Sequence, residues 1–267
     1  MGAEETLTLV GRGVRKHDGD EYLTGRAVYA GDVVLPGMTH AVLVRSPLAH
    51  ARIRSVDTAA ASAMPGVVAV LTGAQAVDLA DEVPPSVDPA PIGGNRAEVR
   101  CLAVDRVLYA GEPVAAVVAE TPGDAVAAAR AVHLDLEPLP AVLDADEALA
   151  DGAPLLYPDW GTNRIIGGEV GSSSEEVEAA VAAAEHVLTG VLRSHRGNAA
   201  PIETRTHLAA WDPVTERLTM YATTQNPHPL RSTLARALRL RESQVHVIAP
   251  RLGGSFGLKM FGNREDF

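Results

Sequence analysis

The spacing of hydrophobic and polar positions in the amino-terminal half of the chain predicts a sheet. β-Branched and apolar residues dominate Thr39 to Val44 and Ala51 to Val56, and Ser46-Pro47 separates these two predicted strands. Val67 to Leu71 is a short apolar run bounded by turn residues, which is typical of a buried strand. We therefore expect three strands here, the third of them buried.

A helix is predicted between two further strands. An apolar, strand-like stretch follows the turn Gly111-Glu112-Pro113 within Val107 to Glu120. Thr121 to Asp124 then supplies an N-cap, a proline at the first helical position and an acid in the first turn, which predicts a helix over Ala125 to Ala131. His133 to Leu136 resumes as a strand. Helices and strands that alternate in this way predict an α+β fold rather than an all-β sandwich.

The carboxy-terminal half opens with a helix signal. Ser172 to Ser174 precede Glu175 and Glu176 at the spacing of a capping box. Four apolar positions share one face of this predicted helix: Val177, Val181, Ala184 and Leu188. The later patterns predict strands over Val187 to Leu192, Thr206 to Trp211 and Leu218 to Thr223, a helix over Pro229 to Leu240, and a strand over Gln244 to Pro250.

Two stretches interrupt these patterns. Val83 to Gly94 is rich in proline and reads as a loop inside the first unit. Glu137 to Pro158 is acidic and proline-rich, with one predicted turn of helix at Asp144 to Leu149, and is typical of a linker. We therefore predict two domains, residues 1–150 and residues 151–267, with the boundary between residues 150 and 165.

Composition narrows the class of protein. The 267 residues are 46% hydrophobic, enough to bury a core, and the net charge of −11 argues against a general nucleic-acid binder. The apolar run at Pro113 to Ala119 is too short for a membrane span, and Met1 to Val10 lacks the apolar segment of a secretory signal. We expect a cytoplasmic protein.

Cys101 is the only cysteine, which excludes an internal disulfide and suits a reducing compartment. A single thiolate also cannot hold a four-cysteine iron–sulfur cluster. Any one-electron transfer would therefore need a partner protein.

Two groups of residues allow more than one interpretation. Arg231, Arg236, Arg239 and Arg241 form a basic cluster that could meet phosphates or another subunit, although the solvated face of a helix is the stronger interpretation. Glu203, His207 and His195 could be proposed as a metal site. Their surroundings read as strand and loop, so helical spacing does not bring Glu203 and His207 together, and structural histidines are the default.

Gly253-Gly254-Ser255-Phe256-Gly257-Leu258-Lys259 is the sharpest local signal. Glycines allow positive φ angles and let backbone N–H groups approach a ligand closely. The run fits neither the dinucleotide fingerprint, because Ser255 replaces a required glycine, nor a Walker A loop, because Leu258 separates Gly257 from Lys259. On its own it is either a ligand cradle or a tight structural turn.

Several motifs in order along the chain resemble one family, the molybdenum-cofactor subunits of the molybdenum hydroxylases. This family includes xanthine dehydrogenases, aldehyde oxidases and aerobic carbon monoxide dehydrogenases. The segments similar to its a/b hammerhead domain are Val10 to Arg12, Thr24 to Tyr29 with Asp32, Arg45 to Pro47, His50 to Ile53, Gly111 to Ala115 and Glu137 to Leu139. Those similar to the start of its molybdopterin-binding domain are Pro201 to Glu203, Thr224 to Pro227 and Gly253 to Lys259.

The resemblance implies a cofactor site. In this family the glutamine of a Thr-Gln pair and the backbone of a glycine-rich turn lie against molybdenum and molybdopterin. The positions that match are Gln225, Gly253, Gly254, Ser255, Phe256 and Gly257, with Ser255 where the family pattern has its third glycine. Amide and backbone donors can hold an oxo ligand without adding a competing charge. No residue of the chain is expected to bind the metal directly.

The resemblance also implies an activity: hydroxylation or oxidation of a small substrate with water as the oxygen source. Two electrons would pass to iron–sulfur and FAD centres in partner subunits. The family's catalytic glutamate, substrate-selecting loops and most pterin contacts lie beyond the glycine turn, so we expect a partial or split subunit that needs the remainder of the molybdenum subunit. The alternative is a non-catalytic interaction or assembly module that retains the hammerhead fold.

Overall fold

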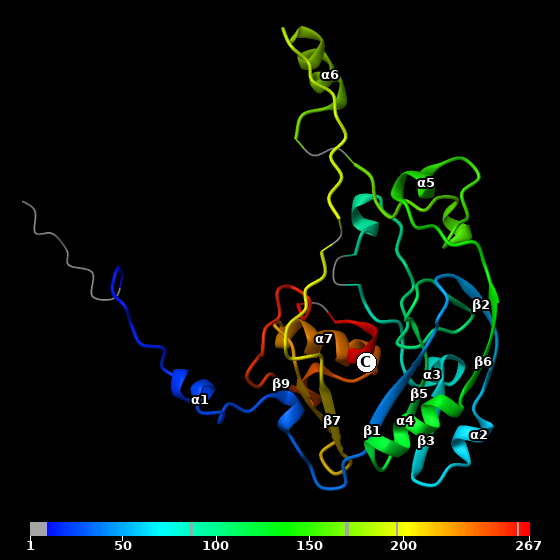
Figure 1. Ribbon diagram of the computed structural model, residues 1–267, viewed down its shortest axis with the longest axis vertical. Coiled ribbons are helices and arrows are strands. Elements are labelled where there is room, and N and C mark those ends of the chain that lie inside the picture. Colours follow the sequence, from blue (N-terminus) through cyan, green and yellow to red (C-terminus); the bar gives the residue numbers. More distant parts are fainter. Residues whose placement is uncertain (1–9, 86–87, 169–170, 196, 261) are drawn as a thin grey trace, which may run out of the picture.

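The computed structural model describes residues 10–85, 88–168, 171–195, 197–260 and 262–267 (Figure 1). The segment Met1 to Val10 therefore lies outside the described residues, apart from Val10 itself. Among the described residues, helices alternate with strands, and the strands form three three-stranded sheets. The predicted α+β class is confirmed.

The first sheet has the strand order β1-β5-β3 and is antiparallel. Its strands are β1 (His40–Arg45), β3 (Val67–Thr72) and β5 (Pro113–Ala119). The predicted positions are confirmed, but the prediction that β3 is buried is wrong. β3 is an edge strand with Val68 58% exposed, whereas the central strand β5 has most of its side chains buried. The position of a strand within the sheet determines how far its side chains are buried, and the apolar run alone does not reveal that position.

The second sheet has the order β4-β2-β6, with β4 (Arg106–Val107), β2 (Ala51–Asp57) and β6 (His133–Pro138). The helix α4 (Pro122–Ala131) packs against the first sheet and α2 (Ala59–Ser62) packs on α4. Thr121 caps α4 by accepting a hydrogen bond from the N–H of Asp124 at 3.1 Å, as predicted. Alanines and valines of α2, α4 and β5 share one buried core.

A helix that the sequence analysis missed follows β3. This helix, α3 (Gly73–Leu79), begins with a capping box in which the side chain of Gln75 accepts a hydrogen bond from the N–H of Thr72 at 2.9 Å. A Cβ on Gly73 would lie 2.0 Å from the carbonyl oxygen of Ala103, so only glycine fits at this position. The helix therefore starts in close contact with the loop that precedes β4.

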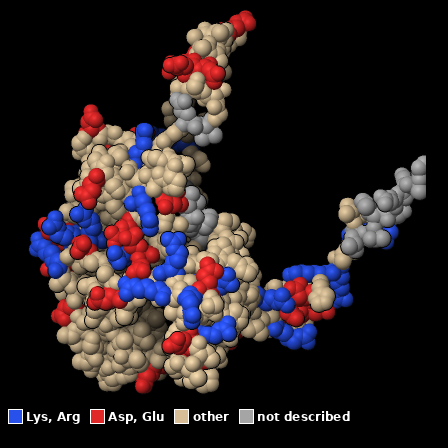
Figure 2. Space-filling view, turned by 180° about the vertical axis from the view of Figure 1, so that it is seen from behind, with Lys and Arg blue, Asp and Glu red and all other residues tan. Residues whose placement is uncertain are grey.

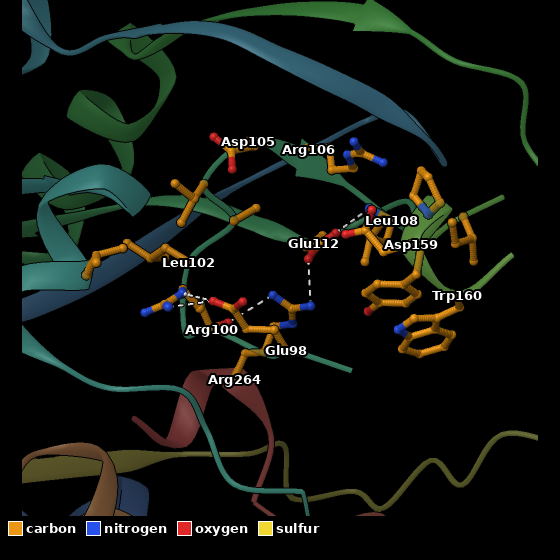
Figure 3. A pocket seen from close by; sticks show the side chains of 16 residues that line it. Glu98, Arg100, Leu102, Asp105, Arg106, Leu108, Glu112, Asp159, Trp160 and Arg264 are labelled. Atoms are coloured by element: carbon orange, nitrogen blue, oxygen red, sulfur yellow. Dashed lines mark hydrogen bonds and ion pairs between the residues drawn. The ribbon is translucent and has the colours of Figure 1, made fainter. Parts of the chain in front are cut away.

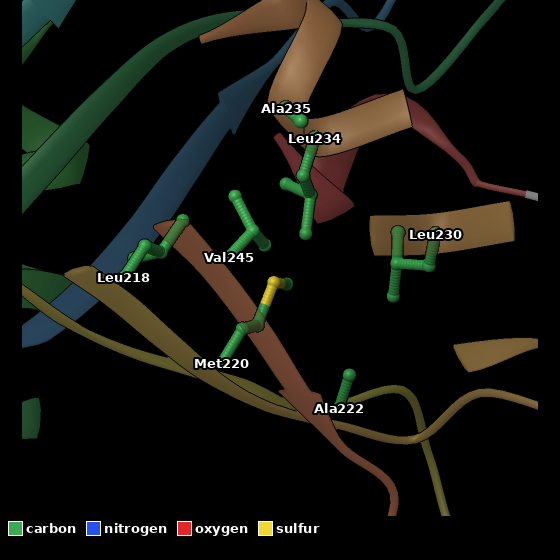
Figure 4. Close-up of a cluster of buried hydrophobic side chains, with 7 residues drawn as sticks. All are labelled: Leu218, Met220, Ala222, Leu230, Leu234, Ala235 and Val245. Carbon is green, nitrogen blue, oxygen red and sulfur yellow. The ribbon is translucent and has the colours of Figure 1, made fainter. Parts of the chain in front are cut away.

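The third sheet has the order β7-β8-β9, with β7 antiparallel and β9 parallel to β8. Its strands are β7 (His207–Asp212), β8 (Arg217–Ala222) and β9 (Val245–Ile248). The helix α7 (Pro227–Ala237) covers this sheet, and Leu230 and Leu234 point toward Met220 and Val245 in the core (Figure 4). These elements confirm the predicted positions.

A linker and a projecting segment join the first two sheets to the third (Figure 1). The linker contains α5 (Ala145–Leu149), and the projecting segment carries α6 (Ser174–Ala183) with the predicted capping box between Ser173 and Glu176. We call residues 171–195 the arm. Acidic side chains gather on its end, while charges of both signs intersperse on the visible face of the body (Figure 2).

Two predictions on the arm are wrong. Helix α6 ends at Ala183, before Leu188, and residues 187–192 form no strand. Leu188 and Leu192 are each 100% exposed. No neighbouring element among the described residues packs against these side chains or supplies a strand with which residues 187–192 could pair. Across the described residues, no helix has both the length and the apolar character to cross a membrane.

The amino-terminal segment returns to the third sheet. It contains α1 (Gly19–Leu23), whose Glu21 forms an ion pair with Arg251 at 2.8 Å. Asp18 pairs with the same guanidinium at 2.9 Å. Tyr29 forms a parallel bridge with Arg251. Arg251 lies between β9 and the glycine-rich turn. Its contacts therefore fix this part of the chain to the segment around Glu21, which is more than two hundred residues earlier in the sequence.

Candidate functional site

The glycine-rich run forms a turn directly after β9. Positive φ angles occur at Gly254 (97°), Phe256 (52°) and Gly257 (88°), whereas Ser255 is outside the left-handed region. The serine at the family's third glycine position therefore carries no strain from a positive φ. Phe256 does carry it, and its ring is 80% exposed beside the turn.

Close approach explains the first two glycines. A Cβ on Gly253 would lie 2.5 Å from the Cβ of Glu203, and a Cβ on Gly254 would lie 3.0 Å from the ring of Phe256 and 3.2 Å from the Cβ of Pro201. Any larger residue would push the turn away from the segment at Pro201 to Glu203. The turn and this segment are therefore fitted to each other.

The turn presents unused hydrogen-bond donors. Within the part of the chain that the structure describes, no acceptor lies against the backbone N–H groups of Gly254, Ser255, Phe256 and Gly257. The buried hydroxyl of Ser255 also has no partner there. Successive backbone N–H groups in a turn can bind anionic oxygens. This arrangement favours a ligand cradle over a purely structural turn.

Glu203 fastens the turn. Its Oε2 accepts one hydrogen bond from the N–H of Gly253 at 2.8 Å and another from the Nζ of Lys259, also at 2.8 Å. The side chain of Lys259 is 0% exposed and that of Glu203 is 13% exposed. A buried ammonium is stable only when it is paired, so this contact is a constraint on the local fold.

Gln225 lies against the same turn. Its N–H donates to the carbonyl oxygen of Lys259 at 2.9 Å, and the side chain of Asn226 donates to the carbonyl oxygen of Met260 at 3.0 Å. Thr224 is buried and its hydroxyl oxygen accepts from the N–H of Asn226 at 3.1 Å. The fold thus brings Gln225 to the glycine turn, with the Gln225 side chain exposed.

A second cluster of charges joins the carboxy-terminal residues to the first two sheets. Arg264 forms an ion pair with the buried Glu112 at 2.7 Å and donates to the carbonyl oxygen of Arg100 at 2.9 Å. Figure 3 shows Glu112 pointing toward Arg264 in a cavity of about 420 Å³, with Trp160 on another side. The other oxygen of Glu112 accepts from the N–H of Leu108.

Glu265 and Asp266 extend this cluster. Glu265 pairs with Arg45 of β1 at 2.9 Å and with Arg205 at 3.5 Å. Asp266 pairs with Arg205 and, at 2.7 Å, with the Nε2 of His207. We call this set the charged contact: Arg45, Glu112, Arg205, His207, Arg264, Glu265 and Asp266.

The acids of the charged contact have shifted pKa values of opposite sign. Burial raises the pKa of Glu112, and the bond from Leu108 and the charge of Arg264 only partly offset it. Burial also acts to raise the pKa of Asp266, but the contact with His207 and the charge of Arg205 outweigh it, so the net shift is downward. Asp266 is therefore held as a carboxylate.

Glu203 and His207 contact different groups in the structure. Glu203 contacts Lys259 and Gly253, while His207 contacts Asp266, and His195 is exposed. Across the described residues, no group of three or more His, Cys, Asp and Glu is placed to hold a metal ion. Glu203 and His207 therefore serve the turn and the charged contact respectively.

The arginine cluster of α7 is largely engaged within the chain. Arg231 pairs with Glu242 at 2.7 Å, and Arg241 donates to the side chain of Gln244 at 3.1 Å. Arg239, just after α7, pairs with Asp81 at 2.8 Å and donates to the carbonyl oxygen of Asp78 in α3. These contacts support a solvated, internally paired face rather than a phosphate site.

Two ion pairs that hold these sites together, Glu203–Lys259 and Glu112–Arg264, were not predictable from local sequence patterns. Glu203 and Lys259 are 56 residues apart, and Arg264 pairs with Glu112 from the region matched by the other profile. No local spacing links such pairs. The only signal was the resemblance itself, because Glu112 and Glu203 each fall in a segment that matches the family's motifs.

Two family profiles match the chain. Residues 24–140 match the a/b hammerhead domain of aldehyde oxidase and xanthine dehydrogenase, and residues 159–267 match the molybdopterin cofactor-binding domain. The charged contact joins these two matched regions, since Arg45 and Glu112 lie in the first and Arg264 and Glu265 in the second.

Individual relatives agree with the profiles. The nicotine 6-hydroxylase large subunit of Paenarthrobacter nicotinovorans is 37% identical over 95% of this chain and 30% of its own length. The carbon monoxide dehydrogenase large chain of Afipia carboxidovorans is 36% identical over 97% of this chain and 33% of its own length. The chain therefore spans about a third of the length of these relatives.

Solved structures show the same similarity. Carbon monoxide dehydrogenase from Oligotropha carboxidovorans superposes with a TM-score of 0.84 at 33% identity, over 96% of this chain and 32% of that one. Quinoline 2-oxidoreductase from Pseudomonas putida 86 gives a TM-score of 0.84 at 32% identity, with the same coverage of each chain. From these matches we conclude that the chain belongs to the aldehyde oxidase and xanthine dehydrogenase family of molybdenum-cofactor-binding large subunits.

Proposed function

We propose that this chain forms one wall of the molybdenum–molybdopterin site of a molybdenum hydroxylase. The observation that carries the proposal is the turn itself, in which four backbone N–H groups and the buried hydroxyl of Ser255 have no partner among the described residues. Such donors suit the anionic oxygens of a pterin-bound metal without adding charge. The close fit of Gly253 and Gly254 against Glu203 and Pro201 keeps these donors in place.

Six residues of the chain would hold the cofactor: Gln225, Gly253, Gly254, Ser255, Phe256 and Gly257. The backbone of the turn and the exposed Gln225 side chain would donate hydrogen bonds, and the exposed ring of Phe256 would shield the site from water. When bound, the cofactor would supply two-electron oxidation of a small substrate with water as the oxygen source. None of these residues would bind the metal directly.

The whole enzyme would need more than this chain. We assign the catalytic base and the substrate-selecting residues to the remaining two-thirds of the length of the relatives, and the iron–sulfur and FAD centres to partner subunits. The names of the relatives support this arrangement, since they are large subunits and, in one case, the gamma subunit of a dehydrogenase complex. The single cysteine supports both the separate iron–sulfur subunit and a cytoplasmic location.

The domain division belongs to the same proposal. We place a hammerhead domain at residues 1–150 and the first part of the cofactor-binding domain at residues 151–267. The interval between the two profile matches supports a boundary in the linker that follows α5. The hammerhead domain would then present Arg45 and Glu112 as the docking surface for the cofactor-binding part.

The test is cofactor content. The chain is co-expressed with its neighbouring reading frames in a host that makes molybdopterin, and molybdenum and pterin are measured per purified complex. Gly254→Ala is expected to lower both by about 10–100-fold, the range for residues that support a metal site. Gly93→Ala is the matched control, because Gly93 has a similar φ of 78° with no atom near its Cβ and lies in another loop.

A stable complex of the unaltered chain without molybdenum or pterin would contradict the proposal. It would favour the alternative of an interaction or assembly module that retains the hammerhead fold. Equal cofactor content in Gly254→Ala and Gly93→Ala would instead show that the turn is not part of the site.

A further inference from the structure

We infer that Glu203 is a positioning residue that sets the shape of the cofactor cradle by fastening both ends of the glycine turn with one carboxylate oxygen. The inference rests on the proposed function and adds a role for Glu203, which does not itself contact the backbone N–H groups of residues 254–257. Oε2 of Glu203 lies 2.8 Å from the N–H of Gly253, where the turn begins, and 2.8 Å from the Nζ of Lys259, where it ends.

The four unpaired N–H groups lie between these two ends. Within the turn, the N–H of Leu258 donates to the carbonyl oxygen of Ser255 at 2.9 Å, which closes only its second half. Across the described residues, Oε1 of Glu203 has no partner, so both side-chain contacts pass through Oε2 alone. A single oxygen thus fixes the distance between the ends of the cradle.

Burial makes this contact hard to loosen. The Lys259 side chain is fully enclosed, and an ammonium in such a place needs its counter-charge close by. Removing the Glu203 carboxylate would therefore force the Lys259 side chain to move toward solvent. That movement would shift the end of the turn.

Lys259 also links Glu203 to Gln225. The carbonyl oxygen of Lys259 accepts a hydrogen bond from the N–H of Gln225 at 2.9 Å, and the hydroxyl of Thr224 lies 3.4 Å from the same carbonyl oxygen. Lys259 thereby holds Glu203 with its side chain and Gln225 with its backbone. Glu203 would position the two groups of cofactor contacts relative to each other.

At the start of the turn, the contact between Glu203 and Gly253 is possible because glycine has no side chain. The N–H of Glu203 donates to the carbonyl oxygen of Gly253 at 3.3 Å, and the N–H of Gly253 returns to the Glu203 carboxylate. This reciprocal pair brings the two residues so close that a Cβ on Gly253 would overlap the Glu203 side chain. A shorter or uncharged residue at 203 would not hold both ends.

The experiment compares Glu203→Gln, Glu203→Asp and the control Glu178→Gln in the co-expressed complex. Glutamine keeps the size but removes the charge, while aspartate keeps the charge but is one methylene too short to reach both partners. Glu178 lies on the exposed face of α6, away from the turn. Three quantities are measured: molybdenum per complex, the electron paramagnetic resonance spectrum of the loaded fraction, and amide hydrogen exchange over residues 253–260.

We expect Glu203→Gln to lower molybdenum content by about 10–100-fold and to speed exchange over residues 253–260, with exchange over β5 unchanged. For Glu203→Asp, we expect a molybdenum content and an exchange rate between those of Glu203→Gln and the control. We also expect a shifted electron paramagnetic resonance spectrum in the fraction that retains metal. A purely structural role would lower thermal stability but leave that spectrum unchanged. If Glu203→Gln does not fold, Glu203→Asp alone decides.

Unchanged exchange over residues 253–260 in both Glu203 variants would overturn the inference, whatever the metal content. Faster exchange together with normal metal content and spectrum would overturn it as well, because the turn would then move without affecting the cofactor. If the unaltered complex carries no molybdenum, the proposed function fails. The exchange measurement then still shows separately whether Glu203 fixes the turn.

Discussion

The two regions matched by the family profiles are joined in two different ways. The linker and the arm connect them along the chain, and the charged contact connects them through space. The arm carries fully exposed leucines at 188 and 192 and exposed acids on α6. In the charged contact, Glu112 is only 1% exposed and Asp266 is 7% exposed. The covalent connection is therefore exposed, whereas the non-covalent one contains buried acids that are paired with basic side chains.

This difference separates local structure from tertiary structure. Helix α6 begins with a capping box, which is a local signal, and none of its residues is buried. The charged contact has no regular local pattern, yet every acid in it has an arginine or histidine partner. A buried charge is tolerated only when it is paired, so the pairs specify how the two regions dock. The predictions below test whether stability follows the charged contact and not the arm.

Glu112→Ala is expected to have the largest effect on stability. It leaves Arg264 without its carboxylate and the N–H of Leu108 without its acceptor. Removing one partner of a buried pair costs about 3–5 kcal/mol. Urea unfolding of the purified protein measures the change. Glu178→Ala on α6 is the control and should change the free energy of unfolding by less than about 0.5 kcal/mol.

Equal effects of Glu112→Ala and Glu178→Ala would erase the distinction between the two connections. A double variant sharpens the test, since Glu112→Leu with Arg264→Met removes both charges. Replacing a buried pair by apolar residues is often close to neutral. We therefore expect the double variant to recover most of the stability lost in Glu112→Ala.

The same contrast explains how far the sequence could be interpreted. Caps and apolar spacing predicted α4, α7, the start of α6 and every strand except β4 within a few residues, because those signals are local. The pattern at Val187 to Leu192 was wrong, since a strand needs a neighbour that the spacing of one segment cannot supply. Helix α3 was missed because its capping box follows directly on a strand.

The candidate site was only partly predictable for the same reason. Family resemblance pointed to the glycine turn and Gln225, and the fold brings them together. The residues that hold them, Glu203 and Lys259, meet across 56 residues, and their pairing depends on burial that no single segment reveals. Glu203 was even considered as a metal ligand with His207, which the structure places against Asp266 instead.

Asp266→Asn is expected to have an intermediate and pH-dependent effect. The pKa of Asp266 is lowered in the folded protein, and its unfolded value is about 3.9. Its stabilising contribution is therefore fully present above that value and is lost as the pH falls through the lower folded pKa. At pH 7 the substitution should cost about 1.5–3 kcal/mol, the range for hydrogen bonds to charged groups.

Urea unfolding at a series of pH values from 7 to 3 measures this dependence. The difference between the unaltered protein and Asp266→Asn should be constant down to about pH 4 and should shrink below it. Glu112 has the opposite sign, since its raised pKa favours the folded state at low pH and this contribution is lost as the pH rises. A constant difference at all pH values would mean that Asp266 is not held as a carboxylate.

The smallest effect is expected in the arm. Leu188→Ser and Leu192→Ser replace side chains that are 100% exposed and contribute no buried area. In this chain, neither change should alter the free energy of unfolding by more than about 0.5 kcal/mol, measured by urea unfolding. Val117→Ser in β5 is the comparison variant and should lower the stability more. Val117 is 0% exposed, so the serine hydroxyl would be buried among apolar side chains. A loss of stability in the arm variants comparable to that of Val117→Ser would show that the arm packs against the body in solution, and the two connections would then be alike.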